Sequence, residues 1–388
     1  MSVAVVGWGL RTALGSDADA ALSALLRGET AARPPRSFDG TDYRAQLVAE
    51  IDGDPAPSRH ARYLRRLALL GCEVAQAALR QSGVATGDRL GLFAAVGGLR
   101  VHWQELMGPM AQQRADASDC WQRGLRGLHP HWLLRHLSNN AHALLAADIH
   151  ARGDGATLAG ATAGAQAIAA ASRALNAGAI DAALIVAYDR LLEPETLVDL
   201  GQRGLPAMVG LQSWVGPYAG NAGGMIPGEA AAALVLVREA EAPLCWVQAR
   251  ATADGELSEP AGSTLAAAAA PLARGIAVVD GAARGVPTLD SAERIALGSV
   301  VDGNAALLAT AAGLGQTGAA AAVVQTIVLA LVLRSGMLPP IACVDVPAVG
   351  PLRPVVTPTP TAATAALGLC SGAPGLAAAV RVDVEKPR

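Results

Sequence analysis

The sequence of 388 residues is poor in lysine, in aromatic residues and in charge. Lys386 is its single lysine, two residues are phenylalanine, and 16% of all residues are charged. With a net charge of −3, the chain shows no basic footprint of the kind that nucleic-acid-binding proteins carry. Its 52% of hydrophobic residues and 43 glycines predict a tightly packed α/β interior built from small side chains.

Cysteine and histidine are few and unevenly placed. The five cysteines form neither a CxxC pair nor the spacing of a metal site, so we expect free thiols in a reducing, cytoplasmic compartment. No cysteine lies between Cys120 and Cys245, and no histidine follows His150. The histidines from His129 to His150 lack carboxylate or cysteine partners at ligand spacing. We therefore expect no metal and no cofactor.

The sequence shows neither a signal peptide nor a clear membrane-spanning segment. The N-terminal MSVAVVGWGL has no basic region and no cleavage site, so we do not expect a signal peptide. The longest apolar run, Gly318 to Leu333, contains Gln325 and Thr326 and is short for a membrane span. The run predicts a buried core helix, and we expect no membrane span.

The most informative stretch runs from Ala156 to Gly178 and reads as a strand, a turn of small residues and a helix. The helix, about Thr162 to Asn176, is apolar nearly all round, which indicates a core position. A strand that turns into a buried helix is a natural seat for a nucleophile, because the helix N-terminus stabilises a thiolate or an oxyanion. Here the turn holds Ala161, which has no reactive group.

The same pattern occurs again near the end of the chain. A glycine-rich turn enters a fully apolar helix over residues 318–336, and strands and helices alternate around both units. The late segments ACVDV and GLAAAVRVDV are expected strands. This duplication predicts a five-layer α/β/α/β/α fold with two buried central helices. We expect an N-terminal half over residues 1–243 and a C-terminal half over residues 244–388.

Several fragments, in order along nearly the whole chain, carry a family resemblance. GATAGAQAIAAASRAL is similar to the active-site cysteine motif of the β-ketoacyl synthases of the thiolase fold, and IPGEAAAALVLVRE to their Gly-Glu-Gly-Ala segment. GVPTLDSAE is similar to the loop after their first catalytic histidine, and GLGQTGAAAAVV to their second histidine motif. The resemblance implies a thiolase-like fold.

The departures from that family concern its catalytic groups. The resemblance places the nucleophilic cysteine of the family at Ala161, its first histidine at Ala282 and its second histidine at Gln316. The motif lysine falls on Ala311, and LCSGAPG replaces the phenylalanine-gated glycine loop, with Cys370 at or near the gate. An acyl thioester needs a nucleophile, which alanine lacks. We therefore expect no condensation by this chain alone.

A synthase that lacks the catalytic cysteine and histidines resembles the chain length factors of type II polyketide synthases. Within that group, it resembles those of the aryl polyene systems. The resemblance implies a heterodimer with an active ketosynthase, an acyl carrier protein that brings the growing chain, and a shared acyl pocket in fatty-acid-like biosynthesis. Two alternatives stay open. One is an acyl-chain-binding homodimer, and the other is a weak acyltransferase or decarboxylase of the same fold.

Four residues are candidates for the shared pocket or interface. The resemblance puts His131 and Trp132 in a loop that crosses the dimer interface, where Trp132 would limit chain length or simply pack. His102 and Trp103 align near a channel-lining position, and the alternative for them is ordinary partial burial.

Three acidic residues and one hydroxyl have structural interpretations. We expect Glu229 to be buried and paired with backbone or an arginine. Asp290 and Glu293, one helical turn apart, are expected to cap their helix or to bind an arginine. Thr162 would need a neighbouring base to act as a nucleophile, and no histidine follows His150.

Overall fold

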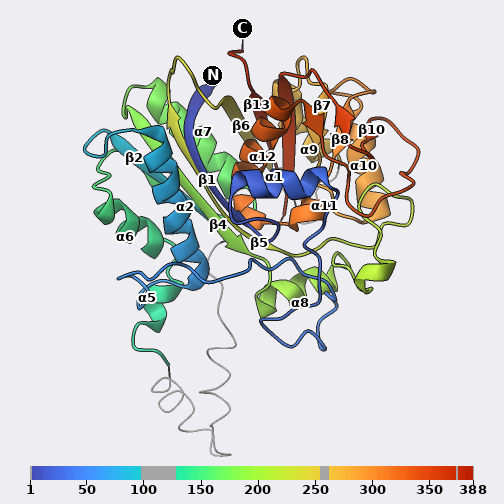
Figure 1. Ribbon diagram of the computed structural model, residues 1–388, viewed down its shortest axis with the longest axis horizontal. Coiled ribbons are helices and arrows are strands. Elements are labelled where there is room, and N and C mark those ends of the chain that lie inside the picture. Colours follow the sequence, from blue (N-terminus) through green and yellow to red (C-terminus); the bar gives the residue numbers. More distant parts are fainter. Residues whose placement is uncertain (1, 98–127, 254–261, 373–374, 388) are drawn as a thin grey trace, which may run out of the picture.

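The computed structural model describes residues 2–97, 128–253, 262–372 and 375–387. Strands and helices alternate through both halves of the chain (Figure 1). Five strands of the first half form one side of the sheet, in the spatial order β1-β5-β4-β2-β3. They are β1 (Val3–Thr12), β2 (Leu90–Val96), β3 (Ala156–Ala159), β4 (Ala182–Arg190) and β5 (Glu229–Val237).

The second half repeats this topology. Its strands follow the order β6-β13-β12-β7-β8, and each neighbouring pair has the same parallel or antiparallel sense as in the first half. These strands are β6 (Cys245–Ala253), β7 (Val278–Asp280), β8 (Ala306–Leu308), β12 (Ala365–Ser371) and β13 (Leu376–Asp383). The duplicated topology is that of a thiolase-like α/β fold, as the sequence predicts.

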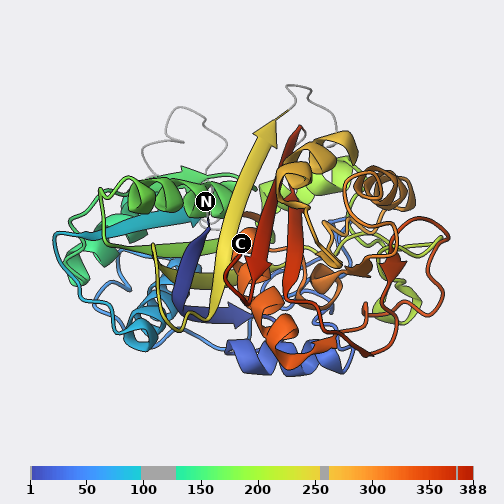
Figure 2. The same cartoon turned by 90° about the horizontal axis from the view of Figure 1, so that it is seen from above.

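The two halves meet along one seam. β1 pairs antiparallel with β6, and Val3 lies opposite Val247 while Val5 lies opposite Cys245. This pairing joins the halves into one sheet of 11 strands that ends at β3 on one side and at the short β10 (Arg353–Pro354) on the other (Figure 2). A further two-stranded sheet consists of β9 (Met337–Leu338) and β11 (Thr359–Pro360).

Two apolar helices occupy the centre, between the strands of the two halves (Figure 1). They are α7 (Ala163–Asn176) and α12 (Ala321–Ser335), which follows the single turn η4 (Gly318–Ala320). The helices approach closely because α7 carries Gly164, where a Cβ would lie 2.7 Å from the Ala319 carbonyl oxygen. Among the described residues, one segment, Gly318–Ser335, is long and apolar enough for a membrane span, and 72% of it is buried. The predicted core helix is confirmed.

Amphipathic helices cover the outer faces of the sheet. α2 (Arg66–Ser82) packs on β1, β4 and β5, and it ends at Gly83, whose φ of 62° permits the left-handed cap. On the other half, α9 (Gly262–Ala269) covers β6, β12 and β13 and contacts α10 (Pro287–Leu297). The remaining helical elements are α1 (Ala18–Leu26), α5 (Trp132–His136), α6 (Asn140–Asp148), α8 (Pro194–Gln202), α11 (Thr310–Leu314), η2 (Leu211–Ser213) and η3 (Ala270–Leu272). Five layers result.

One strand prediction is wrong. The segment ACVDV, residues 342–346, forms a turn instead of a strand. Cys343 adopts a φ of 57°, and its carbonyl oxygen accepts a hydrogen bond from Gly216 N at 2.9 Å. The segment is therefore tied to a neighbouring loop. The late strand of this region is β12, whose residues follow the Pro/Thr-rich loop.

Candidate functional site

The turn between β3 and α7 contains Ala161, the position at which the resemblance places the nucleophile of the family. Ala161 follows Gly160, whose φ of 103° lets the chain reverse before the helix begins. The neighbouring hydroxyl belongs to Thr162, which is buried and accepts a hydrogen bond from Gln166 Nε2 at 2.9 Å. Among the described residues, the hydrogen-bond partner of the Thr162 hydroxyl is therefore an amide and not a base.

A glycine segment lies directly against Ala161. A Cβ built on Gly372 would lie 1.9 Å from the Ala161 Cβ, so only a glycine fits at this position. Arg203 Nη2 donates to the Gly372 carbonyl oxygen at 3.1 Å. Arg284 Nη1 donates to the carbonyl oxygen and the hydroxyl of Ser371, at 3.1 and 3.2 Å. Two guanidinium groups therefore hold the segment that covers the emptied position.

These two arginines are the residues that sequence reasoning missed. Arg203 follows α8, and Arg284 lies in the loop after β7, where its side chain is buried. Neither belongs to a charge run or to a periodic pattern, and their partners are 169 and 87 residues away along the chain. The one sequence signal that could have drawn attention to this loop is an arginine among small and apolar residues, two positions after Ala282.

The other two emptied positions touch each other. Gln316 Nε2 donates to the carbonyl oxygens of Ala282 and Ala283, at 2.8 and 2.9 Å. The Gln316 backbone is fixed as well, because its N–H donates to Ile226 O at 2.8 Å and its carbonyl oxygen accepts from Gly228 N at 2.9 Å. The Gln316 amide therefore fixes the loop that contains Ala282 and Ala283.

The described residues enclose a very small cavity beside this contact. It measures about 20 Å³ and is lined by Ala282, Gln316 and Cys370, among others. A volume of this size holds about one water molecule. Cys370 lies in β12 and is buried, and burial together with the Asp280 charge raises the pKa of its thiol to about 12. A thiol in this state is a poor nucleophile.

Two buried acidic residues, Glu293 and Asp290, hold the loop around Ala282. Glu293 Oε1 accepts from Ala282 N at 2.7 Å. Asp290 accepts from Tyr218 N at 2.9 Å and from Gly285 N at 3.1 Å. Burial raises the pKa of Glu293 to about 8 and that of Asp290 to about 6. The two residues are structural, as expected, but they hold backbone N–H groups of neighbouring loops rather than capping α10.

Asp280 makes a third buried acidic contact at the same level. Its carboxylate accepts from the N–H and the hydroxyl of Thr310, at 2.8 and 2.6 Å, and from Gln325 Nε2 at 3.1 Å. Burial raises the pKa of Asp280, while these hydrogen bonds lower it. Because Gln325 lies on α12, the network ties the central helix to the end of β7. Gln325, a polar residue inside the apolar helix α12, therefore has a structural role.

Glu229 behaves as expected. It is buried at the start of β5 and forms ion pairs with Arg66 at 3.1 Å and with Arg190 at 2.7 Å. It also accepts a hydrogen bond from Ile51 N at 2.9 Å. With two guanidinium partners and a backbone donor, the carboxylate is a structural anchor.

The candidate pocket residues lie on a different element. His131 and Trp132 sit at the start of α5, where Trp132 stacks on His136 with ring centroids 4.4 Å apart. The His131 ring lies 5.0 Å from that of Tyr63. His102 and Trp103 fall outside the residues that the structure describes. The described part of the chain also shows no group of three potential metal ligands.

Comparisons with known proteins agree with this architecture. Residues 1–242 match the family description "Beta-ketoacyl synthase, N-terminal domain", and residues 249–345 match "Beta-ketoacyl synthase, C-terminal domain". No curated protein matches the sequence significantly.

Solved structures share the fold at low sequence identity. A β-ketoacyl synthase from Burkholderia phymatum is 18% identical, with a TM-score of 0.84 and 98% of each chain covered. The ishigamide ketosynthase/chain length factor is 17% identical, with a TM-score of 0.83 and the same coverage. The ketosynthase from module 6 of the bacillaene synthase of Bacillus subtilis is 17% identical, with a TM-score of 0.81, and the match covers 100% of this chain and 73% of that one.

Proposed function

Because the chain belongs to the β-ketoacyl synthase family, we propose that it is a non-catalytic subunit that pairs with an active ketosynthase and shapes the pocket for its acyl chain. The observation that carries this proposal is the closure of the emptied site. Gly372 lies against Ala161, and Gln316 bonds to Ala282. Condensation requires a nucleophile to hold the acyl group, and this arrangement provides neither the nucleophile nor the space.

Two features of the first half support pairing with a partner. β3 lies at the end of the sheet, and among the described strands it pairs with β2 alone. An edge strand leaves a row of N–H and C=O groups open to another chain. Nearby in sequence, α5 and the residue after it expose Leu133 (66%) and Leu137 (42%). Exposed leucines and an open sheet edge each suit a partner surface.

The finer parts of the proposal concern the pathway and the pocket. We propose that the acyl or polyene chain arrives on an acyl carrier protein in the cytoplasm, and that Trp132 with His131 contributes to the end of the shared pocket. The stacking of the Trp132 ring on the His136 ring supports this part of the proposal, because it holds a large aromatic side chain in one orientation. The division at residues 243 and 244 stays a prediction.

Co-expression with an active ketosynthase from the same genome tests the proposal. A tag on this chain alone would isolate any complex, whose native mass and malonyl-dependent elongation are then measured. We expect a one-to-one heterodimer that elongates only when both chains are present. A homodimer that ignores the synthase and retains acyl ligands would support an acyl-binding role instead. Elongation or malonyl decarboxylation by the lone chain would support the enzyme alternative.

A further inference from the structure

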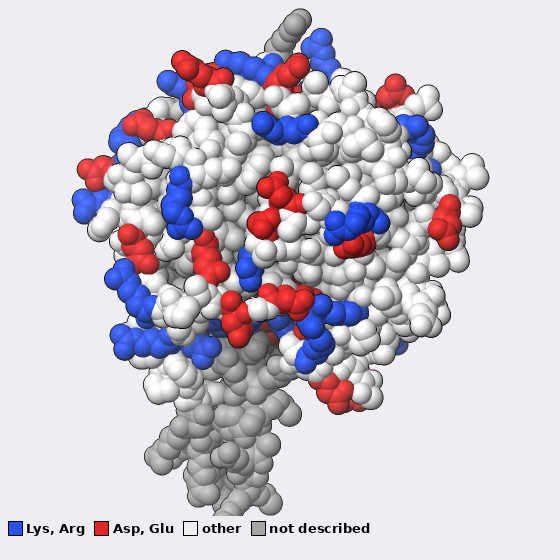
Figure 3. Space-filling view, viewed as in Figure 1, with Lys and Arg blue, Asp and Glu red and all other residues white. Residues whose placement is uncertain are grey.

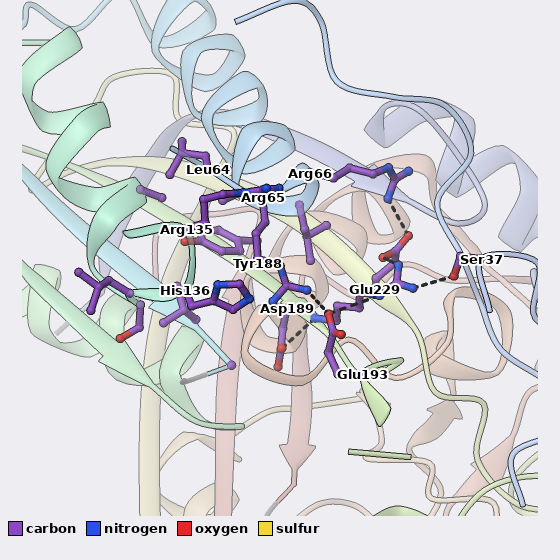
Figure 4. A pocket seen from close by; sticks show the side chains of 18 residues that line it. Ser37, Leu64, Arg65, Arg66, Arg135, His136, Tyr188, Asp189, Glu193 and Glu229 are labelled. Atoms are coloured by element: carbon purple, nitrogen blue, oxygen red, sulfur yellow. Dashed lines mark hydrogen bonds and ion pairs between the residues drawn. The ribbon is translucent and has the colours of Figure 1, made fainter. Parts of the chain in front are cut away.

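A cavity of about 330 Å³ lies beside the C-terminal ends of β2 and β4 (Figure 4). The start of α2 and the turn of α5 complete its wall. Its volume falls in the lower part of the range for small-molecule sites, roughly 300 to 1,000 Å³. The carboxyl ends of parallel strands are also where α/β proteins most often bind ligands. We call this cavity the arginine pocket, because four arginines line it.

The carboxylates of the arginine pocket already have cationic or backbone partners. Glu193 pairs with Arg65 at 2.5 Å and with Arg190 at 3.6 Å. Glu229 pairs with Arg190 and Arg66, as described above. A carboxylate oxygen of Asp189 accepts from Ala319 N at 2.9 Å. The negative charges of the lining are therefore engaged within the protein.

One arginine of the lining is left over. The Arg135 guanidinium makes no hydrogen bond or ion pair with any residue that the structure describes, and its Nε atom is buried. The lining holds four arginines against three carboxylates, and Arg135 is the arginine for which no carboxylate partner is described. In Figure 4, Arg135 and His136 lie at the end of the pocket away from Arg66 and Glu229.

A second donor shares this cavity. Tyr188 lines the pocket, and its hydroxyl makes no hydrogen bond with the described residues. Leaving the buried Nε–H of Arg135 without an acceptor costs free energy, which an incoming acceptor can recover. A guanidinium binds carboxylate and phosphate oxygens especially well, because its planar fork offers parallel N–H donors.

We propose that the arginine pocket binds a small anion, a carboxylate or a phosphate, through the Arg135 guanidinium. Tyr188 would contribute a second hydrogen bond. The ion pairs of Glu193 and Glu229 would keep the opposite wall rigid, so that the anion enters a preformed site. This site is separate from the emptied catalytic positions, and the proposal does not depend on the partner proposed above.

Thermal unfolding of the full chain tests the proposal. The midpoint temperature is measured against increasing malonate in one series and inorganic phosphate in another, at constant ionic strength, with malonamide as the uncharged analogue. Ligand binding to the folded state raises the midpoint with a saturable dependence, whereas general salt exclusion acts without saturation. We expect a saturable rise with at least one anion and none with malonamide. A response to malonate alone identifies a carboxylate site, and a response to phosphate alone identifies a phosphate site.

Two variants show whether the effect belongs to the pocket. Arg135→Gln should abolish the saturable rise. Arg80→Gln removes the same charge from an exposed position of α2 outside the pocket lining and should leave it intact. Without added anion, Arg135→Gln should unfold at the same or a higher temperature than the parent, because it removes a guanidinium whose buried Nε atom has no described partner.

Three results would overturn the proposal. They are the absence of a saturable rise with both anions, an equal rise in Arg135→Gln, and a lower unfolding temperature of Arg135→Gln without anion. If Arg135→Gln does not fold, Arg135→Lys replaces it in isothermal titration. The lysine keeps the charge but loses the fork, so we expect about a tenfold weaker affinity. Unchanged affinity in that variant would equally contradict the proposal.

Discussion

Gln316 Nε2 lies 2.8 Å from the carbonyl oxygen of Ala282. These are the two positions at which the family resemblance places catalytic histidines, and here they bond to each other. The side-chain amide of Gln316 donates hydrogen bonds to the backbone carbonyl oxygens of Ala282 and Ala283. The pair therefore forms a structural contact at two positions where the resemblance places catalytic groups. This relationship makes the contribution of Gln316 to stability measurable.

Replacement of Gln316 by alanine should destabilise the protein by about 1 to 3 kcal/mol, because two buried carbonyl groups lose their donor. Gln316→Glu should cost more, since a carboxylate would face two carbonyl oxygens. Urea unfolding of both variants measures the effect. Gln76→Ala, at an exposed position of α2, is the control and should stay within about 0.5 kcal/mol of the parent. Equal stability of Gln316→Ala and the control would contradict the prediction.

Gly372→Ala should destabilise the protein by about 1 to 3 kcal/mol, because the new Cβ would lie 1.9 Å from the Ala161 Cβ. Adding Ala161→Gly to this variant should restore part of the loss, since it removes the atom that clashes. A double-mutant cycle of unfolding free energies measures the coupling. Gly210→Ala is the matched control, because a Cβ there meets nothing within 4 Å. Additive effects of the two substitutions would show that the contact does not exist.

The sequence predicts the local elements well and the long-range closure poorly. α7 and α12 were predictable because their apolar runs are continuous and are bounded by glycine, as the left-handed Gly178 and Gly336 show. The hydrogen bond to the Gly372 carbonyl was not predictable, because its donor Arg203 lies 169 positions earlier in the sequence. The same holds for the pairing of β1 with β6, which depends on the seam between the halves.

The placement of Cys370 shows another limit. Its segment, LCSGAPG, contains two glycines and a proline, a composition typical of loops. The structure instead ends β12 at Ser371, which leaves Cys370 inside a strand that pairs with β13 and β7. Pairing on both sides outweighs the weak local preference of such a segment. Burial of the thiol follows from that tertiary pairing and not from the local sequence.

Stability should fall with rising pH through the titration of Glu293. Its folded pKa is raised from 4.5 to about 8, so below pH 4.5 both the folded and the unfolded state bind the proton. Between pH 4.5 and 8 the unfolded state ionises first, and the stability contribution is lost as pH rises to the folded pKa. Glu293→Gln should flatten this slope and keep the acceptor for Ala282 N. Urea unfolding at several pH values checks it, with Glu241→Gln, an exposed position, as the control. A slope equal to that of the parent would sink the prediction.

His142 should produce the opposite dependence at lower pH. Its Nδ1 lies 2.9 Å from the Thr157 hydroxyl, a contact that ties α6 to the edge strand β3. Burial lowers the pKa of this imidazole below 6.5, which favours the neutral form in the folded state. Its stability contribution is therefore present above pH 6.5 and is lost as pH falls through the folded pKa.

Hydrogen exchange of the β3 amides detects this loss locally. We expect faster exchange, after correction for intrinsic rates, when the pH falls from 7.5 to about 5.5. The reason is that protonation of His142 weakens its hydrogen bond with the Thr157 hydroxyl, which joins α6 to β3. His142→Gln keeps a donor and an acceptor but does not titrate, so its exchange should stay flat over this range. His129→Gln, which lies before α5, is the control and should follow the parent. If the parent shows no change, or if His142→Gln shows the same change as the parent, this histidine does not govern the strand edge.

An edge strand that loosens below pH 6.5 would also pair less well with a partner. The same pH series applied to a purified complex should therefore show dissociation that begins in that window. The complex of the His142→Gln variant should show no such dissociation.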